Sequence, residues 1–106
     1  MEDCLFCKIA NKEIPADRDY EDEQFLAFHD IHPKSPLHLL IIPKKHINSV
    51  NHLELGDRDL MGDMVFTAQK VAKARALKGY QLHINVGREG GQVVDHLHMH
   101  LQADRP

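Results

Sequence analysis

The stretch DHLHMHL, residues 95–101, places a histidine at every second position with an apolar residue between neighbours. Side chains of a β-strand alternate between its two faces, so this pattern predicts a strand over 96–101. The three histidines would share one face, while Leu97, Met99 and Leu101 would face the core. The chain must therefore build a sheet in which this strand is polar on one side only.

The segment before it repeats the pattern. In YQLHINV, residues 80–86, Leu82, Ile84 and Val86 fall on one face. The glycine-rich REGGQ between the two segments is typical of a turn. The two strands would then pair as a hairpin, which brings Asn85 within reach of the histidines.

The first half of the chain predicts a short helix and three more strands. The helix is expected over 4–11, and the strands lie around Tyr20, over Phe25–Asp30 and over 37–43. The segment IHPKSP, residues 31–36, must be a loop, because each proline biases the residue before it away from helix.

The long helix is expected over about 57–77, with Asp57 as its N-cap and Gly79 as its left-handed stop. Its apolar residues recur at helical spacing and predict one buried stripe. The stripe contains Leu60, Met61, Met64, Val65, Ala68, Val71 and Ala72.

These elements predict an α+β fold, with an antiparallel sheet of about five strands, one long helix and a short N-terminal helix. The 106 residues contain no repeat or linker and suit a single domain over 1–106.

Charge and hydropathy exclude several function classes. The net charge is −3, and the only basic run is Lys44-Lys45, so a nucleic-acid surface is not expected. The longest aliphatic block, Leu39–Ile42, is far too short to span a membrane. The acidic N-terminus does not resemble a signal peptide, so we expect a cytoplasmic protein.

Three interpretations of the histidines compete. They are a histidine-rich strand face, a three-histidine zinc site, or a nucleophile with flanking groups that hold an anion. Alternate residues of a strand lie about 6.5–7 Å apart, so the outer two cannot easily share one ion. The glycines upstream favour the third interpretation, because they let backbone N–H groups approach a phosphate.

Cys4 and Cys7 have the spacing of a zinc half-site, and His46 offers a third ligand. A redox pair and two packed or free thiols are the alternatives. A redox role is the weaker one, since the Cys-x-x-Cys motif does not follow a predicted strand.

HLHMHL resembles the His-φ-His-φ-His-φ signature of the histidine triad superfamily of nucleotide hydrolases and transferases. LFCKIANKEIPA, YEDEQFLAFHDIHPKSPLHLLIIPKKHI and GYQLHINVGREGGQ are similar to segments of its nucleotide-binding branch, the purine nucleoside phosphoramidases. The resemblance covers nearly the whole chain.

The resemblance implies a covalent reaction. His98 would attack the α-phosphorus and form a nucleotidyl-histidine, which water then hydrolyses. His100 and Asn85 would hold phosphoryl oxygens, and His38 would position the nucleophile and assist proton transfer. Backbone N–H groups would contribute from Gly91, Gln92, Val93 and Val94.

The resemblance also implies a pocket for a purine nucleoside, with Asp30 accepting the ribose hydroxyls. From pattern alone its apolar members would be core residues. They are Phe6, Ile9, Phe28 and Leu40, with His29 and Ile31 as further lining.

Some bacterial members of the superfamily carry a zinc site that corresponds to Cys4, Cys7, His46 and His96. Four protein ligands fill a tetrahedral site, so this zinc would be structural. The family resemblance further implies a homodimer whose sheets join across the two-fold axis.

Two departures from the family affect the substrate. Val93 stands where members commonly carry a small hydroxyl residue, and QADRP replaces a longer tail that contributes to leaving-group selection. They favour, as one alternative, a nucleotide-binding or scaffold protein with vestigial catalysis. Dinucleoside polyphosphate hydrolysis by the same His98 is another alternative, because the triad itself does not select the leaving group.

Overall fold

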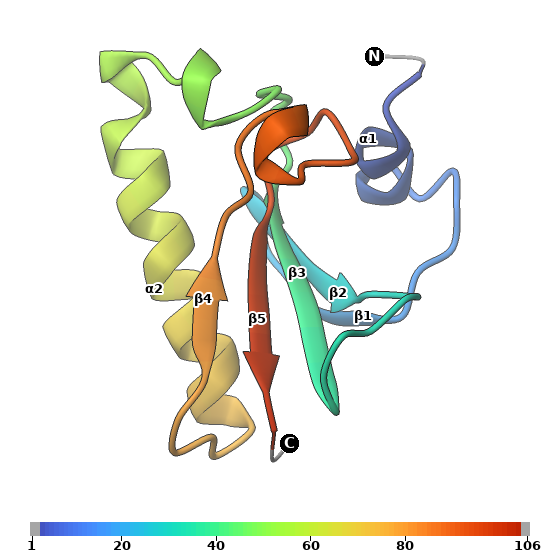
Figure 1. The fold of residues 1–106 in the computed structure, drawn as a ribbon, viewed down its shortest axis with the longest axis vertical. Helices are drawn as coiled ribbons and strands as arrows, with labels where there is room; N and C mark the ends of the chain where they lie inside the picture. Colours follow the sequence, from blue (N-terminus) through green and yellow to red (C-terminus); the bar gives the residue numbers. More distant parts are fainter. Residues whose placement is uncertain (1–2, 105–106) are drawn as a thin grey trace.

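The computed structural model describes residues 3–104 and contains a five-stranded antiparallel sheet with a helix on each side (Figure 1). The sheet order is β1-β2-β3-β5-β4. The elements are α1 (Leu5–Ala10), β1 (Arg18–Glu21), β2 (Phe25–His29), β3 (Leu37–Pro43), α2 (Arg58–Ala74), β4 (Gln81–His83) and β5 (Met99–Ala103). The predicted α+β class, with five strands, one long helix and a short N-terminal helix, is confirmed.

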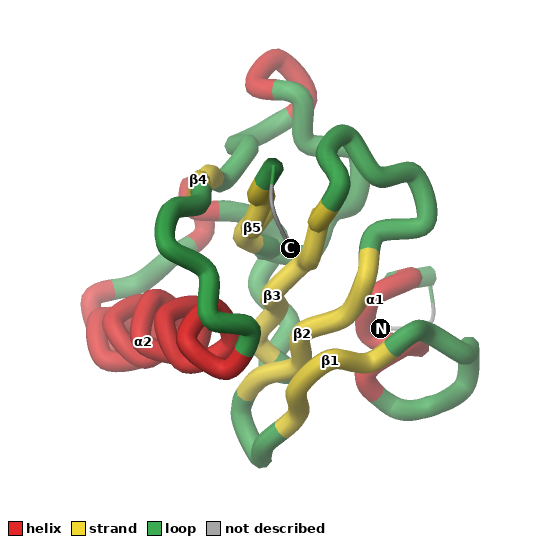
Figure 2. Tube along the Cα trace, turned by 90° about the horizontal axis from the view of Figure 1, so that it is seen from below, coloured by secondary structure: helices red, strands yellow, loops and turns green. Residues whose placement is uncertain are grey.

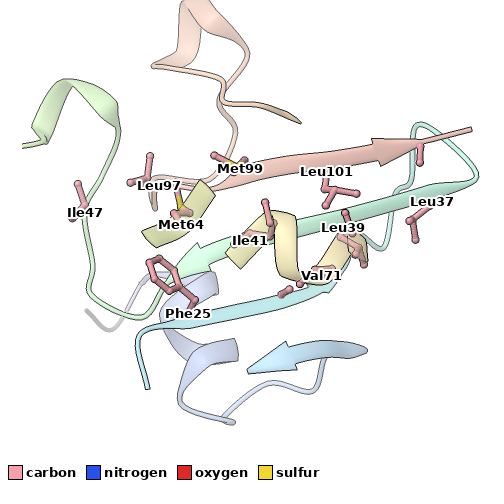
Figure 3. Close-up of a cluster of buried hydrophobic side chains, with 14 residues drawn as sticks. Phe25, Leu37, Leu39, Ile41, Ile47, Met64, Val71, Leu97, Met99 and Leu101 are labelled. Atoms are coloured by element: carbon pink, nitrogen blue, oxygen red, sulfur yellow. The ribbon is translucent and has the colours of Figure 1, made fainter. Parts of the chain in front are cut away.

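One face of the sheet packs against α2 and forms the larger core (Figures 2 and 3). Alternate residues of the central strands supply it, as a period of two requires. Its largest members are Phe25, Leu39, Ile41, Met64, Val71, Leu97 and Leu101.

The opposite face packs against α1 over β2 and β3. Phe6 and Ile9 of α1 are buried against Leu26, Phe28 and Leu40 of these strands. The same face continues across β5 and β4, which carry the histidines, so α1 ends beside the polar part of the sheet.

The strand predicted over 96–101 is wrong at its start. β5 begins only at Met99, and residues 96–98 lie outside the sheet, with a bend at His96. The cause is a long-range hydrogen bond, because the Leu97 N–H donates to the carbonyl of Ile47 at 2.7 Å and not to a neighbouring strand. β4 is likewise shorter than predicted and covers only Gln81–His83.

α2 begins and ends close to its predicted bounds but differs in detail. The predicted buried residue Val65 is 47% exposed, and Thr67 is buried instead. Asp57 directly precedes the helix but makes no cap hydrogen bond to it. Its carboxylate accepts from the Glu54 N–H at 2.9 Å and from Lys45 at 2.8 Å, which fixes the preceding turn.

The predicted stop at Gly79 is wrong, because Ala76 takes the left-handed conformation, with a φ of 56°. The Leu77 N–H donates to the Ala72 carbonyl and the Ala76 N–H to the Lys73 carbonyl, both at 3.0 Å. This is the Schellman pattern, in which glycine is the preferred residue.

We therefore expect Ala76→Gly to raise the free energy of unfolding by about 1 kcal/mol, because it removes the steric cost of a Cβ at positive φ. Urea unfolding measures the change. Ala74→Gly, at the last helical residue, is the matched control and should destabilise by about 1 kcal/mol. An unchanged or lower midpoint for Ala76→Gly would contradict the expectation.

None of the helices within residues 3–104 is long and apolar enough to cross a membrane.

Candidate active site and metal centre

His98 lies just before β5 and presents one free ring nitrogen. Its Nδ1 lies 2.7 Å from the carbonyl oxygen of His96, which can only accept, so Nδ1 carries the proton. Nε2 makes no hydrogen bond to any described residue and keeps its lone pair. Burial, partly under the edge of the Phe6 ring, lowers the pKa of His98 and favours the neutral imidazole. A neutral imidazole with a fixed tautomer and an available Nε2 is a competent nucleophile.

A chain of hydrogen bonds orients His100. The backbone N–H of Lys34 donates to Nδ1 of His38 at 3.0 Å, so the His38 proton sits on Nε2. His38 Nε2 in turn lies 2.8 Å from Nδ1 of His100 and donates to it. The Nε2–H of His100 is thereby left as a donor, the form that binds a phosphoryl oxygen.

The hydrogen bonds connect His38 to His100 and not to His98. Asp30 lies 3.5 Å from His38 Nε2 through one carboxylate oxygen, and no hydrogen bond joins His38 to His98 among the described residues. His38 therefore orients His100 directly, and any effect of His38 on His98 passes through the ring contact of His100 with His98 at 5.1 Å.

His83 belongs to the same histidine cluster, although it was not predicted as a site residue. It pairs with His100 across β4 and β5, and the two rings stack at 4.4 Å with only 6° between their planes. The alternation of YQLHINV places the His83 side chain on the same face as Asn85. Pairing of this strand with HLHMHL in the correct register would therefore have predicted His83 as a site residue.

The buried histidines predict a loss of stability in acid. Burial lowers the pKa of His38, and burial together with His98 lowers that of His100 to about 4. An unfolded histidine takes up its proton near pH 6.5, so the unfolded state binds more protons between about pH 6.5 and 4. The free energy of unfolding should therefore fall as the pH drops through this window. Urea titrations at pH 7 and 5 measure it, and His100→Gln should show a weaker pH dependence than wild type.

The glycine loop between β4 and β5 uses some of its amides internally. The N–H of Gly91 donates to the Arg88 carbonyl at 3.0 Å, and that of Gln92 to the Gly87 carbonyl at 2.9 Å. Gly91 has a φ of 88°, and the Asn85 side chain braces it by donating to the Gly90 carbonyl at 2.8 Å. Asn85 thus supports the loop, and two of the four predicted phosphate donors are already engaged.

The other two of the four predicted donors, the N–H groups of Val93 and Val94, make no hydrogen bond to the described residues. The Val93 side chain is 80% exposed. Of the four predicted donors, these two are therefore the ones available to an anion.

The apolar residues predicted to line a nucleoside pocket lie where α1 meets the sheet and form a buried cluster there. Phe6 and Phe28 meet edge to face at 5.4 Å, and both are buried together with Ile9 and Leu40. Ile31 is 84% exposed just beyond β2 and can only form a rim.

The structure does not bring the His29 side chain to this pocket. His29 follows Phe25 and Ala27 on the α2 face of β2, where Arg75 donates to its Nε2 at 3.2 Å. Only the backbone of His29 lies near the predicted pocket.

Cys4, Cys7, His46 and His96 come together from three distant segments. The Cys4 sulfur lies 3.2 Å from His96 Nδ1, and the Cys7 sulfur 3.3 Å from His46 Nδ1. The two Nδ1 atoms are 3.2 Å apart. Tetrahedral zinc with these donors would separate them by roughly 3.3–3.8 Å, so the cluster fits a metal ion.

The tautomers of this cluster also suit a metal. His96 Nε2 donates to the Pro43 carbonyl at 2.7 Å, and His46 Nε2 to the Asn48 side-chain oxygen at 2.6 Å. Both Nδ1 atoms are then unprotonated and face each other and the two sulfurs, so without a cation only the weak S–H donors of Cys4 and Cys7 reach them, whereas a metal ion would satisfy both. Burial raises the pKa of Cys7 to about 11, so metal binding must release the thiol proton.

Asp30, His38 and His100 also approach one another closely enough to hold a metal, but their tautomers oppose it. The Lys34 N–H occupies His38 Nδ1, so a metal on Nε2 would have to displace the only ring proton. This cluster is a hydrogen-bonded relay.

Known proteins are similar to this chain in sequence and in fold. Residues 3–105 match the family model described as scavenger mRNA decapping enzyme C-term binding. Protein HitA of Neisseria gonorrhoeae is 48% identical over 104 residues, 97% of either chain. The HIT family hydrolase of Legionella pneumophila Philadelphia 1 superposes with a TM-score of 0.94 at 49% identity, covering 98% of this chain and 95% of that one. A histidine triad nucleotide-binding protein from Candida albicans gives 0.84 at 36% identity, covering 92% and 72%.

Proposed function

This chain belongs to the histidine triad (HIT) family of nucleotide hydrolases, and we propose that it hydrolyses nucleoside 5′-phosphoramidates of the purine type through a nucleotidyl-His98 intermediate. The observation that carries the proposal is the 2.7 Å hydrogen bond from His98 Nδ1 to the His96 carbonyl. It fixes the tautomer in which Nε2 can attack phosphorus, as covalent catalysis requires.

In the first step, Nε2 of His98 forms a bond to the α-phosphorus while the phosphorus–nitrogen bond breaks. The leaving amine departs with a proton from solvent. The His100 Nε2–H and the amides of Val93 and Val94 donate to phosphoryl oxygens, where charge develops. In the second step, water attacks the phosphorus, the phosphorus–Nε2 bond breaks and a proton of the water passes to solvent, which releases the nucleotide and restores neutral His98.

The nucleoside would contact the edges of Phe6, Phe28 and Leu40, and Asp30 would accept its ribose hydroxyls. Asp30 is suited to this role because one of its oxygens is fixed by the His32 N–H at 2.9 Å while the other faces the histidine relay.

A zinc ion held by Cys4, Cys7, His46 and His96 would have a structural role. With four protein ligands it has no open position for water, so it would supply cross-linking of three segments and no hydrolytic chemistry.

Rapid mixing of the protein with adenosine 5′-phosphoramidate tests the proposal. We expect release of AMP and, after acid quench of an early time point, a protein mass increased by one adenylyl group that peptide mapping assigns to His98. Hydrolysis without any adenylylated protein would contradict the covalent mechanism, and no hydrolysis would favour a nucleotide-binding module.

Phosphoanhydride cleavage is the second candidate, for dinucleoside polyphosphates in particular. The observation in its favour is Val93, which offers no hydroxyl beside the free loop amides. A phosphate leaving group needs no protonation to depart, whereas an amine does, so a site without that hydroxyl should penalise anhydrides less. A comparison of kcat/KM for the two substrate types distinguishes them.

We further propose a homodimer. It is supported by the family resemblance and by exposed apolar residues, namely Phe66 of α2 and Leu82 of the edge strand β4. Sedimentation equilibrium of the wild type and of Leu82→Glu tests it, with a monomer expected only for the variant.

A further inference from the structure

We propose that Asn48 couples the metal centre to the phosphate-binding loop, so that zinc and nucleotide strengthen each other's binding. The inference rests on the proposed function for the identity of the nucleotide. It concerns the segment His46–Asn48, which follows β3 and lies at the same end of the sheet as the β4–β5 connection (Figure 1).

On the metal side, the Asn48 side-chain oxygen accepts from His46 Nε2 at 2.6 Å. This contact holds the ring so that Nδ1 faces Cys7 and His96. Partners of this kind around a metal ligand typically change metal affinity 10- to 100-fold when they are removed.

On the loop side, the backbone carbonyl of Asn48 accepts from the Gln92 side chain at 2.7 Å. The same Gln92 amide also donates to the Val94 carbonyl at 2.9 Å and accepts from the Gly87 N–H at 2.8 Å. Gln92 is buried, so it acts as a clamp that joins both ends of the loop to Asn48. The free amides of Val93 and Val94 lie within the clamped segment.

A second connection reaches the nucleophile. His96 would bind the metal through its ring, while its carbonyl holds His98 Nδ1 at 2.7 Å. Between them, the Leu97 N–H donates to the Ile47 carbonyl at 2.7 Å. The segments 46–48 and 96–98 are therefore joined in the backbone, and the metal would join their side chains.

Without a cation, the two Nδ1 atoms 3.2 Å apart are held only by the weak S–H donors of Cys4 and Cys7, at 3.2 and 3.3 Å. Four metal–ligand bonds would fix the segments that hold the loop and His98 more firmly than these contacts do. Zinc should therefore favour the conformation that binds phosphate, and by thermodynamic reciprocity nucleotide should increase zinc affinity by the same factor.

The test measures zinc affinity by competition with a chromophoric chelator, with and without saturating AMP, on folded zinc-loaded protein. We expect AMP to tighten zinc binding about 10-fold, within the usual range of coupling between two sites. Calorimetric titration of AMP into zinc-loaded and zinc-stripped protein should give the same factor.

Asn48→Ala removes the side-chain contact to His46 but keeps the carbonyl that holds Gln92. It should reduce the coupling factor to less than half, even when the variant is fully zinc-loaded and folded. Asn51→Ala is the matched control, because Asn51 is exposed and lies outside both sites.

A zinc affinity that is the same with and without AMP would overturn the coupling, and so would a wild-type coupling factor in Asn48→Ala. If zinc-loaded wild-type protein does not bind AMP at all, the proposed function fails and the coupling fails with it. AMP binding to zinc-loaded Asn48→Ala with the wild-type affinity would also overturn the coupling. It would mean that the zinc centre only stabilises the fold.

Discussion

Replacement of His98 by alanine is expected to lower kcat for adenosine 5′-phosphoramidate by roughly 10⁴- to 10⁶-fold, because loss of a covalent nucleophile removes the whole two-step path. Neither the other two triad imidazoles nor His38 can take over the attack. His38 and His100 are bonded to each other through their inward nitrogens, and His96 uses Nε2 on the Pro43 carbonyl. The measurement is initial-rate hydrolysis with AMP detected chromatographically.

The same variant should still bind AMP with an affinity within a few fold of wild type. The groups proposed to hold the nucleotide lie outside His98, and they are the loop amides and the pocket around Phe6 and Asp30. His52→Ala is the matched control, since His52 is exposed in a turn away from the site. Equal hydrolysis rates for His98→Ala and the control would contradict the nucleophile assignment and favour a binding module.

The elements of the fold were predictable because each carries a strong local signal. β3 contains a continuous aliphatic run and is buried at every position, and the alternation around β5 places Leu101 and Met99 in the core as expected. The boundaries that failed depend on distant partners. β5 starts late because Leu97 bonds to Ile47, fifty residues earlier, and no local pattern in HLHMHL reports that contact.

The candidate site also has features that could be predicted from the sequence and features that could not. Family resemblance assigned Cys4, Cys7, His46 and His96 to one metal centre, and the structure brings these four together. The ring protons could not be predicted, because they depend on single backbone groups such as the Lys34 N–H and the His96 carbonyl. The stacking of His83 on His100 likewise depends on strand register.

Removal of zinc is expected to cause the largest loss of stability. A metal that binds only the native state stabilises it by about 4 kcal/mol when its concentration is a thousand times Kd. In a domain of this size each kcal/mol shifts Tm by roughly 4–8 °C, so a strong chelator should lower Tm by roughly 15–30 °C. Protein purified without added metal should contain close to one equivalent of zinc, and less than a tenth of an equivalent would contradict the metal site.

Cys4→Ser separates the metal from the local structure of α1. Cys4 is the N-cap of this helix, and its sulfur accepts from the Cys7 N–H at 3.2 Å. Serine is among the best N-cap residues, so the substitution keeps the cap while it removes a thiolate ligand. The variant should therefore lose most of the zinc-dependent stability in metal-replete buffer. In excess chelator it should unfold at nearly the same temperature as the wild type, because both then lack the ion.

Two outcomes would contradict this expectation. Equal stability of the two proteins in metal-replete buffer would show that the cluster holds only packed thiols. A Tm difference that persists in chelator would assign the effect to packing of Cys4 in the core.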